Sequence, residues 1–247
     1  MKPFALALVP MALILKQPDL GTALIFIPCL FAMLFVAGAK VRHLAMIATL
    51  GIALGALAWL SGTERPVFRH LPEVVKKYQR DRVYAMFSSD PRTLHETGFQ
   101  QHNALVAFGS GGLAGKGMGV IPIGRHVPER HNDMIYALIG EQFGFFGAAV
   151  VLGAYLVLFT AGIEISSGTR EPFGRLVAVG VVSILAGQTF LNLLVAVKLM
   201  PVTGVTLPFI SYGGSSLIAS FMAAGLLLNI GQNRPIVMAN NSFEFSD

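Results

Sequence analysis

Long apolar runs recur along this sequence and predict transmembrane helices. A helix needs about 20 apolar residues to cross a bilayer. Stretches of suitable length are residues 20–39, 43–60, 134–160, 176–197 and 205–230. Two weaker candidates are residues 3–15 and 103–112, the second as part of a crossing over 99–114. The pattern therefore predicts an all-α, polytopic transmembrane helical bundle with six or seven spans.

Composition supports the membrane class. Of the 247 residues 54% are hydrophobic and 13% charged, whereas a soluble domain carries about 25% charged residues. The single cysteine, Cys29, excludes an intrachain disulfide and a Cys-based metal site. The net charge of +5 comes without a long Lys/Arg tract, which indicates membrane-flanking charge and no nucleic-acid binding. No polar linker divides the chain, so residues 1–247 are expected to form a single membrane domain with a loose tail over 231–247.

The basic side chains suggest an orientation. The main cluster, seven of the 18 Lys and Arg residues, lies between residues 61 and 98, and Lys and Arg are enriched in cytoplasmic loops. We therefore expect a cytoplasmic basic loop over 61–98. If 99–114 crosses the membrane, the following loop 113–132 is extracytoplasmic.

The glycine-rich stretch GSGGLAGKGMG, residues 109–119, does not have the spacing of a nucleotide-binding loop. A P-loop needs Gly five places before the Gly-Lys pair and Ser or Thr after it, but here Ser110 and Gly117 hold those positions. Two interpretations stay open. The stretch is either a flexible turn that leaves a helix or a loop that lets a bulky ligand approach the backbone.

Titratable residues are concentrated just before the span that begins near residue 134. They are His126, Glu129, Arg130, His131 and Asp133. One interpretation is interfacial charge plus a helix N-cap at Asn132 or Asp133. The other is an acid held at a membrane surface as a general base. Glu141 lies about two turns deeper, where an ionisable side chain should face the bundle interior; it is either paired locally or functional.

The segment MPVTGVTLPFISYGGSS, residues 200–216, combines proline, glycine and hydroxyl side chains. Irregular backbone at membrane depth is tolerated where protein or water satisfies it. We expect this segment to line a cavity, with close packing of helices through small residues as the alternative.

Together these stretches resemble the SEDS family of cell-wall polymerases, the RodA/FtsW group. The matching pieces occur in the family's order and are KQPDLGTALIF, YQRDRVYAMFSSDPRT, GFQQHNALVAFGSGGLAGKG, VPERHNDMIYALIGEQFG and PVTGVTLPFISYGGSS. The PVTG before PFISYGGSS is more similar to RodA, the elongation member, than to the division member. The family is known as ten-helix peptidoglycan glycosyltransferases of the bacterial plasma membrane that use lipid II. Compared with it, about three N-terminal helices are expected to be absent from this chain.

The resemblance implies that Asp133 stands at the family's essential aspartate, in the large extracytoplasmic loop. Asn132 departs from the more usual Thr but leaves the acid in place. We predict Asp133 as the catalytic base, and a divalent cation, Mg or Mn, is a candidate cofactor. The predicted substrate-binding residues are Lys116, Arg125, Glu129, Arg130, His131, Ser211, Tyr212, Ser215 and Ser216.

The resemblance also implies partners. These are lipid II, the membrane, and a class B penicillin-binding transpeptidase that supplies cross-linking. Two other functions stay open on the sequence alone: a flippase that moves lipid II through the same cavity, and a non-catalytic membrane scaffold for cell-wall enzymes.

Overall fold

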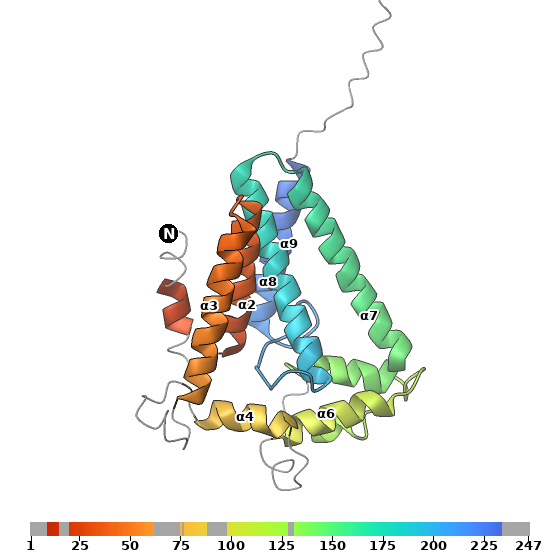
Figure 1. The fold of residues 1–247 in the computed structure, drawn as a ribbon. Helices are drawn as coiled ribbons and strands as arrows, with labels where there is room; N and C mark the ends of the chain where they lie inside the picture. Colours follow the sequence, from red (N-terminus) through yellow and green to blue (C-terminus); the bar gives the residue numbers. More distant parts are fainter. Residues whose placement is uncertain are drawn as a thin grey trace, which may run out of the picture.

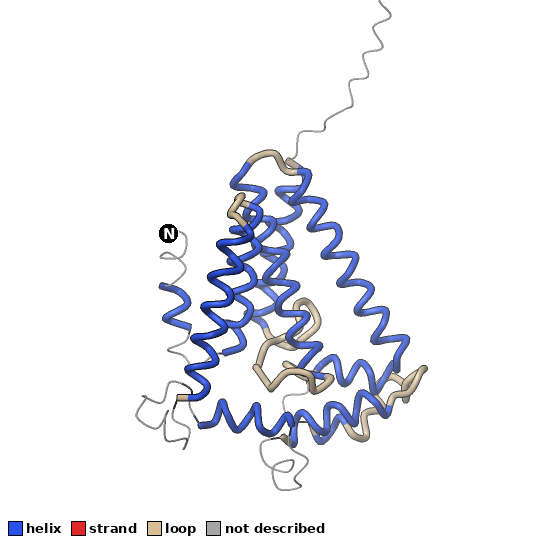
Figure 2. Tube along the Cα trace, in the orientation of Figure 1, coloured by secondary structure: helices blue, strands red, loops and turns tan. Residues whose placement is uncertain are grey.

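The computed structural model describes residues 9–14, 20–61, 75, 77–87, 98–127 and 131–233, and within these ranges the regular elements are helices (Figure 2). The helices that run along the bundle are α2 (Leu20–Val36), α3 (Val41–Leu60), α7 (Ile135–Gly168), α8 (Pro172–Ala196) and α9 (Gly214–Gln232) (Figure 1). All except α2 are long and apolar enough to cross a membrane, and α2 has 17 residues. The prediction of an all-α, polytopic membrane bundle is confirmed.

Helix α8 packs against both α2 and α9. It begins where Glu171 caps it, since the carboxylate accepts hydrogen bonds from the backbone N–H groups of Phe173 and Gly174. A glycine lets α2 approach α8 closely, because a Cβ atom added at Gly187 would lie 3.0 Å from Ile25 Cγ2. Small residues at helix contacts are the usual means of close packing inside membranes.

The expected crossing over 99–114 is wrong. Helix α6 (Phe99–Ser110) has 12 residues, about 18 Å of helix, and lies across one end of the bundle beside α4 (Lys77–Phe87) (Figure 1). Both helices make hydrogen bonds to the backbone near the C-terminal end of α8. Gln101 Nε2 donates to Val195 O at 3.1 Å, and Arg82 Nη1 donates to Val202 O at 3.0 Å.

The described parts of the loops 61–98 and 113–132 therefore lie at the same end of the bundle, and the expectation that they lie on opposite sides of the membrane is also wrong. The expected crossing rested on a short apolar stretch in the second half of α6, and the helix is too short to span a membrane. The predicted span over 3–15 lies largely outside the described residues. The described chain accounts for five of the predicted spans, namely α2, α3, α7, α8 and α9.

Helix α7 is broken at Gly144, which has φ 64° and ψ −160°. The break frees backbone groups, and the glycine-rich stretch over 111–117 satisfies them. Phe145 N donates to Gly112 O at 2.8 Å, and Gly117 N donates to Gln142 O at 3.0 Å. The chains approach so closely that a Cβ atom at Gly111 would lie 1.9 Å from Gly140 O. In this structure the glycines of the stretch thus allow a close approach to the backbone of α7.

Candidate functional site

Asp133 lies in a turn over 131–134 that leads directly into α7 at the end of the bundle occupied by α4 and α6. Its side chain is 9% exposed, and the next residue, Met134, is fully buried. Met134 packs with Ala104, Val127 and other apolar side chains and anchors the turn. The N-cap position of α7 is held by Met134, without a capping hydrogen bond from its side chain. Neither Asn132 nor Asp133 holds that position.

The segment that follows α8 holds the backbone of this turn. Ser211 Oγ donates a hydrogen bond to Asn132 O at 2.5 Å, and Tyr212 N donates to His131 O at 2.8 Å. Ser211 is 1% exposed, and its hydroxyl also accepts from Leu207 N at 2.8 Å. The structure thus brings two stretches that the sequence singled out, residues 126–144 and 200–216, into direct contact. It gives Ser211 a supporting position, whereas Tyr212 is exposed.

Asn192 of α8 is a further polar residue at the turn, and the sequence analysis did not identify it. Its Nδ2 donates to Asp133 O at 2.9 Å and to Val205 O at 2.8 Å. The available signal was a single carboxamide near the end of an otherwise apolar predicted span over 176–197. Hydropathy weighs such a residue as one unfavourable position and carries no information about its hydrogen bonds.

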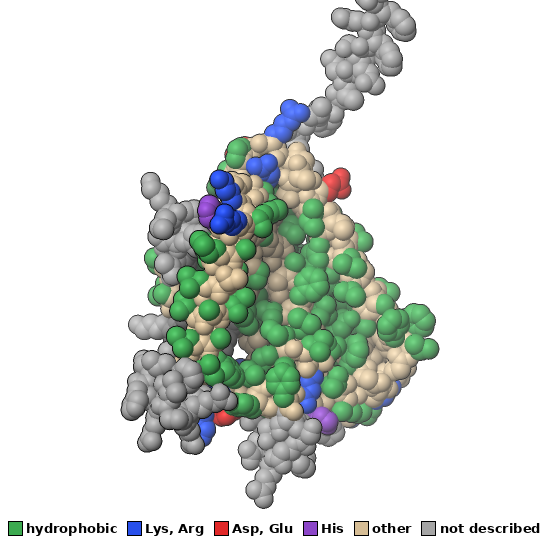
Figure 3. All heavy atoms as spheres, viewed as in Figure 1, with side chains coloured by type: hydrophobic (Ala, Val, Ile, Leu, Met, Phe, Trp, Pro, Cys, Tyr) green, Lys and Arg blue, Asp and Glu red, His purple; other side chains and the backbone are tan. Residues whose placement is uncertain are grey.

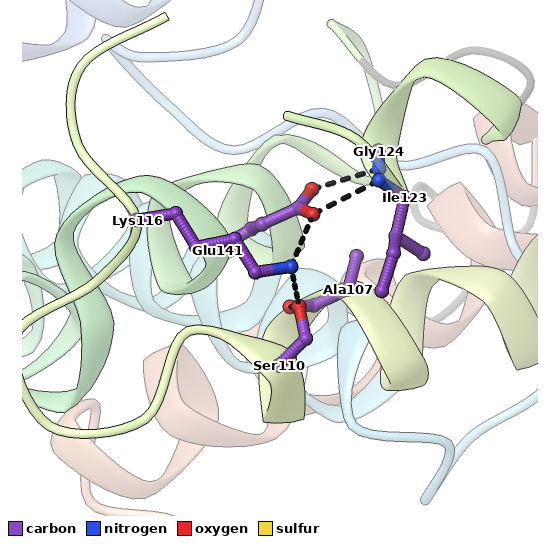
Figure 4. Close-up of polar contacts among 6 residues, drawn as sticks. All are labelled: Ala107, Ser110, Lys116, Ile123, Gly124 and Glu141. Carbon is purple, nitrogen blue, oxygen red and sulfur yellow. Dashed lines mark hydrogen bonds and ion pairs between the residues drawn. The ribbon is translucent and has the colours of Figure 1, made fainter. Parts of the chain in front are cut away.

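Glu141 is fully buried and holds the glycine-rich loop in place (Figure 4). Lys116 Nζ lies 3.0 Å from Glu141 Oε1 and donates to Ser110 Oγ at 2.6 Å. The backbone N–H groups of Ile123 and Gly124 donate to the same carboxylate at 3.0 and 2.7 Å. The interpretation of Glu141 as locally paired is confirmed. Lys116, predicted to bind substrate, is paired with this internal carboxylate, and its side chain is 25% exposed.

The remaining predicted residues are distributed around the same end of the bundle. Arg125 is exposed on the short helix η1 (Gly124–His126), and His131 is exposed in the Asp133 turn. Ser215 and Ser216 lie in the first turn of α9, where Ser216 Oγ donates to Gly213 O at 3.0 Å. Glu129 and Arg130 lie outside the described residues.

Within the part of the chain that the structure describes, no group of three or more His, Cys, Asp or Glu side chains is placed to hold a metal ion. A divalent cation is commonly bound by only one or two carboxylates together with substrate phosphates. The Mg or Mn considered above therefore stays a prediction, and no chemical step below is assigned to a metal.

The irregular segment over 201–213 lines cavities, as the sequence predicted. Residues 201–204 form one wall of a cavity of about 310 Å³ beside α2 and α4. Phe209 and Ile210 lie at a groove of about 590 Å³ between α7 and α9, and its lining is almost entirely apolar. The groove shares Val150, Val151 and Ile210 with a second apolar hollow that reaches Ile139, close to the start of α7. Hydrophobic side chains also dominate the outer face that Figure 3 shows.

Comparison with known proteins gives consistent matches along most of the chain. Residues 1–235 match the family model of FtsW, RodA and SpoVE, described as cell cycle protein. A probable peptidoglycan glycosyltransferase FtsW of Geobacter sulfurreducens is 38% identical over 228 residues, which cover 90% of this chain and 56% of that protein. Stage V sporulation protein E of Bacillus subtilis is 37% identical over 221 residues, 89% of this chain and 56% of that protein.

Solved structures show the same fold. A chain from a peptidoglycan synthase complex, described as coordinating polymerization and crosslinking, matches with a TM-score of 0.70 and 34% identity, covering 94% of this chain and 61% of that one. RodA of Thermus thermophilus, a rod shape determining protein, matches with a TM-score of 0.55 and 29% identity, covering 94% of this chain and 56% of that one. The chain thus spans just over half the length of the curated relatives it matches.

Proposed function

We propose a glycosyltransferase activity for this multi-pass membrane protein, which belongs to the FtsW, RodA and SpoVE family of cell cycle proteins. Its substrate is lipid II and its product is a peptidoglycan strand. The observation that carries the proposal is Asp133, a carboxylate at the end of an apolar bundle, in a turn held by segments from two other parts of the chain. The peptidoglycan glycosyltransferase named among the relatives supports this activity.

In the proposed reaction the Asp133 carboxylate takes the proton of the 4-hydroxyl on the acceptor sugar. That oxygen forms a bond to the anomeric carbon of the second substrate, while the bond from this carbon to the lipid diphosphate breaks. The electron pair leaves with the diphosphate, and the configuration at the carbon inverts. A base at the water–lipid boundary suits a substrate whose sugar is polar and whose anchor is a lipid.

The leaving diphosphate needs neutralisation of its charge more than protonation, and preorganised cations supply it. Of the predicted cations within the described residues, Arg125 is exposed at this end of the bundle, and the exposed His131 beside Asp133 adds a ring N–H that can donate a hydrogen bond to the diphosphate. Lys116 is a weaker candidate, since Glu141 already balances its charge. We therefore assign the diphosphate to the surface that includes Arg125 and His131.

The apolar groove between α7 and α9 supports a lipid-linked substrate. Its continuation toward Ile139 brings a nearly unbroken apolar surface from the middle of the bundle to the first turns of α7. Inside the bilayer a prenyl chain is already in hydrocarbon, so such a surface holds it by van der Waals packing and by shape. The groove is thus our candidate site for the lipid anchor.

We further propose that the Asp133 end is extracytoplasmic. The positive-inside rule applies to short loops, because segments longer than about 60 residues are translocated largely regardless of charge. The segment from α3 to α7 exceeds this length. The short connections at the opposite end carry Lys40, Arg42 and Arg170. Counting these loops alone reverses the side expected for residues 61–98 and keeps Asp133 outside.

Labelling of single cysteines tests this orientation. In a Cys29→Ala background, a cysteine at Leu199 is expected to react with a membrane-impermeant maleimide in intact spheroplasts, because Leu199 is exposed at the Asp133 end. A cysteine at Arg170, at the opposite end, should react only after lysis. The reverse pattern would place Asp133 in the cytoplasm and exclude the proposed reaction.

The cellular role and partner are finer proposals. The sequence motif PVTG before PFISYGGSS favours a role in elongation, whereas the relatives named FtsW favour a role in division. We propose that the protein acts in cell-wall synthesis during growth, and on the basis of this motif we propose elongation. The neighbour from a complex described as coordinating polymerization and crosslinking supports a transpeptidase partner, which we propose to be of class B.

The activity is tested by incubating the purified protein in liposomes with lipid II and analysing the product. We expect glycan chains that a muramidase degrades. Movement of lipid II across the bilayer without glycan would support the flippase alternative. Neither product, together with normal cell-wall synthesis in cells that carry changes at Asp133, would support the scaffold.

A further inference from the structure

Asn192 is a buried carboxamide in the membrane-embedded part of α8. It is 1% exposed, and its Nδ2 donates to the backbone carbonyls of Asp133 and Val205. The chemistry of the neighbours fixes the orientation of the amide. Both are carbonyl oxygens, which only accept hydrogen bonds, so the NH₂ group must face them. The Oδ1 atom then points away from them and has no hydrogen-bond partner among the residues that the structure describes.

Burying an amide oxygen without a hydrogen-bond partner costs free energy. Burial alone would therefore favour an apolar side chain at position 192. Its NH₂ group, however, does what an apolar side chain cannot do. It joins two segments far apart in the sequence, the Asp133 turn and the segment that contains Val205, to one rigid helix. The length of the side chain then sets the distance of both segments from α8.

The same contact completes the support of the turn. Three consecutive carbonyl groups, of His131, Asn132 and Asp133, accept hydrogen bonds from Tyr212 N, Ser211 Oγ and Asn192 Nδ2. The first two donors belong to the 205–212 segment, which Asn192 also holds through Val205 O. Asn192 therefore supports Asp133 in two ways: it binds the carbonyl of Asp133 itself, and it holds the segment whose donors bind the two preceding carbonyls.

We propose that Asn192 is a positioning residue: it fixes the peptide group of Asp133 and thereby the origin of its carboxylate relative to the acceptor hydroxyl. This role rests on the proposed glycosyltransferase function. Asn192 itself does not touch the reacting atoms. Its loss should change the rate of the chemical step more than the binding of substrate, since a displacement of about 1 Å costs on the order of 10²-fold in rate.

The test compares Asn192→Leu, of similar size but without donors, with Thr189→Val. Thr189 is a matched control because it lies in the same helix, is 1% exposed, and its Oγ1 bonds only within α8, to Leu185 O. With lipid II as substrate, Asn192→Leu is expected to lower kcat by about 10²-fold while KM changes by less than about threefold. Thr189→Val should leave both constants within about twofold. Thermal unfolding is measured for each protein.

A second variant keeps the test decisive if Asn192→Leu does not fold. Asn192→Thr is neutral and close in size, and its hydroxyl can donate at most one of the two hydrogen bonds, so its kcat should lie between those of Asn192→Leu and the unchanged protein. An unchanged kcat in a folded Asn192 variant overturns the positioning role, as does an equal loss in Thr189→Val or a rise in KM alone.

The two proposals fail in distinguishable ways. If the unchanged protein polymerises lipid II and a folded Asn192 variant does so at the same kcat, the role of Asn192 alone is wrong. If the unchanged protein forms no glycan, the proposed function is wrong, and the role that rests on it falls with it.

Discussion

An Asp133→Asn protein is expected to keep its fold and to polymerise lipid II about 10²–10⁴-fold more slowly, the contribution that a general base typically makes. Asparagine has nearly the same shape as aspartate but cannot accept the proton of the acceptor hydroxyl. The contacts that position the turn involve the backbone of residues 131–133 and the buried side chain of Met134. The substitution leaves all of these in place.

The rate of glycan formation and the thermal unfolding transition are both measured, so that loss of chemistry is separated from loss of fold. Asp81→Asn is the matched control: it makes the same chemical change on α4, at the same end of the bundle. It should polymerise at nearly the unchanged rate. A folded Asp133→Asn protein with normal activity would remove Asp133 from the role of base.

The membrane helices could be predicted from the sequence because hydropathy reports the length of an apolar run. The runs over 43–60 and 176–197 became α3 and α8 with small shifts at their ends. Hydropathy does not report direction, and α6 shows the limit. Only its second half is apolar, and the helix lies across the bundle, held by Gln101. Counting 99–114 as a span therefore separated loops 61–98 and 113–132, whose described parts lie at the same end of the bundle.

The sequence allowed prediction of several residues of the candidate site, but not of the contacts between them. The sequence identified Asp133 and the hydroxyl-rich segment, but the bond from Ser211 to the turn joins residues 79 positions apart. The sequence left two interpretations of the glycine-rich stretch open, because a glycine indicates that another group comes close to the backbone but does not identify that group. Here the neighbour is the break in α7 at Gly144. Asn192 was missed because one carboxamide hardly alters the hydropathy of a long apolar helix.

A Lys116→Met protein is expected to lose about 3 kcal/mol of unfolding free energy, the lower end of the range for breaking a buried ion pair. The change leaves the fully buried Glu141 carboxylate without its cation, and only two backbone N–H groups and no other charge then face it in the described structure. The lower end applies because the Lys116 side chain is 25% exposed, so water can partly replace it. Equilibrium unfolding in mixed micelles measures the loss.

Two further proteins decide whether the unpaired charge is the cause. Lys40→Met, an exposed lysine at the opposite end of the bundle, should change the unfolding free energy by less than about 0.5 kcal/mol. Lys116→Met combined with Glu141→Gln should recover part of the loss, because glutamine keeps an acceptor for the N–H groups of Ile123 and Gly124 but carries no charge. If the double variant is only as stable as Lys116→Met alone, the loss does not come from the unpaired charge, and the packing of the lysine chain holds the glycine-rich loop against α7.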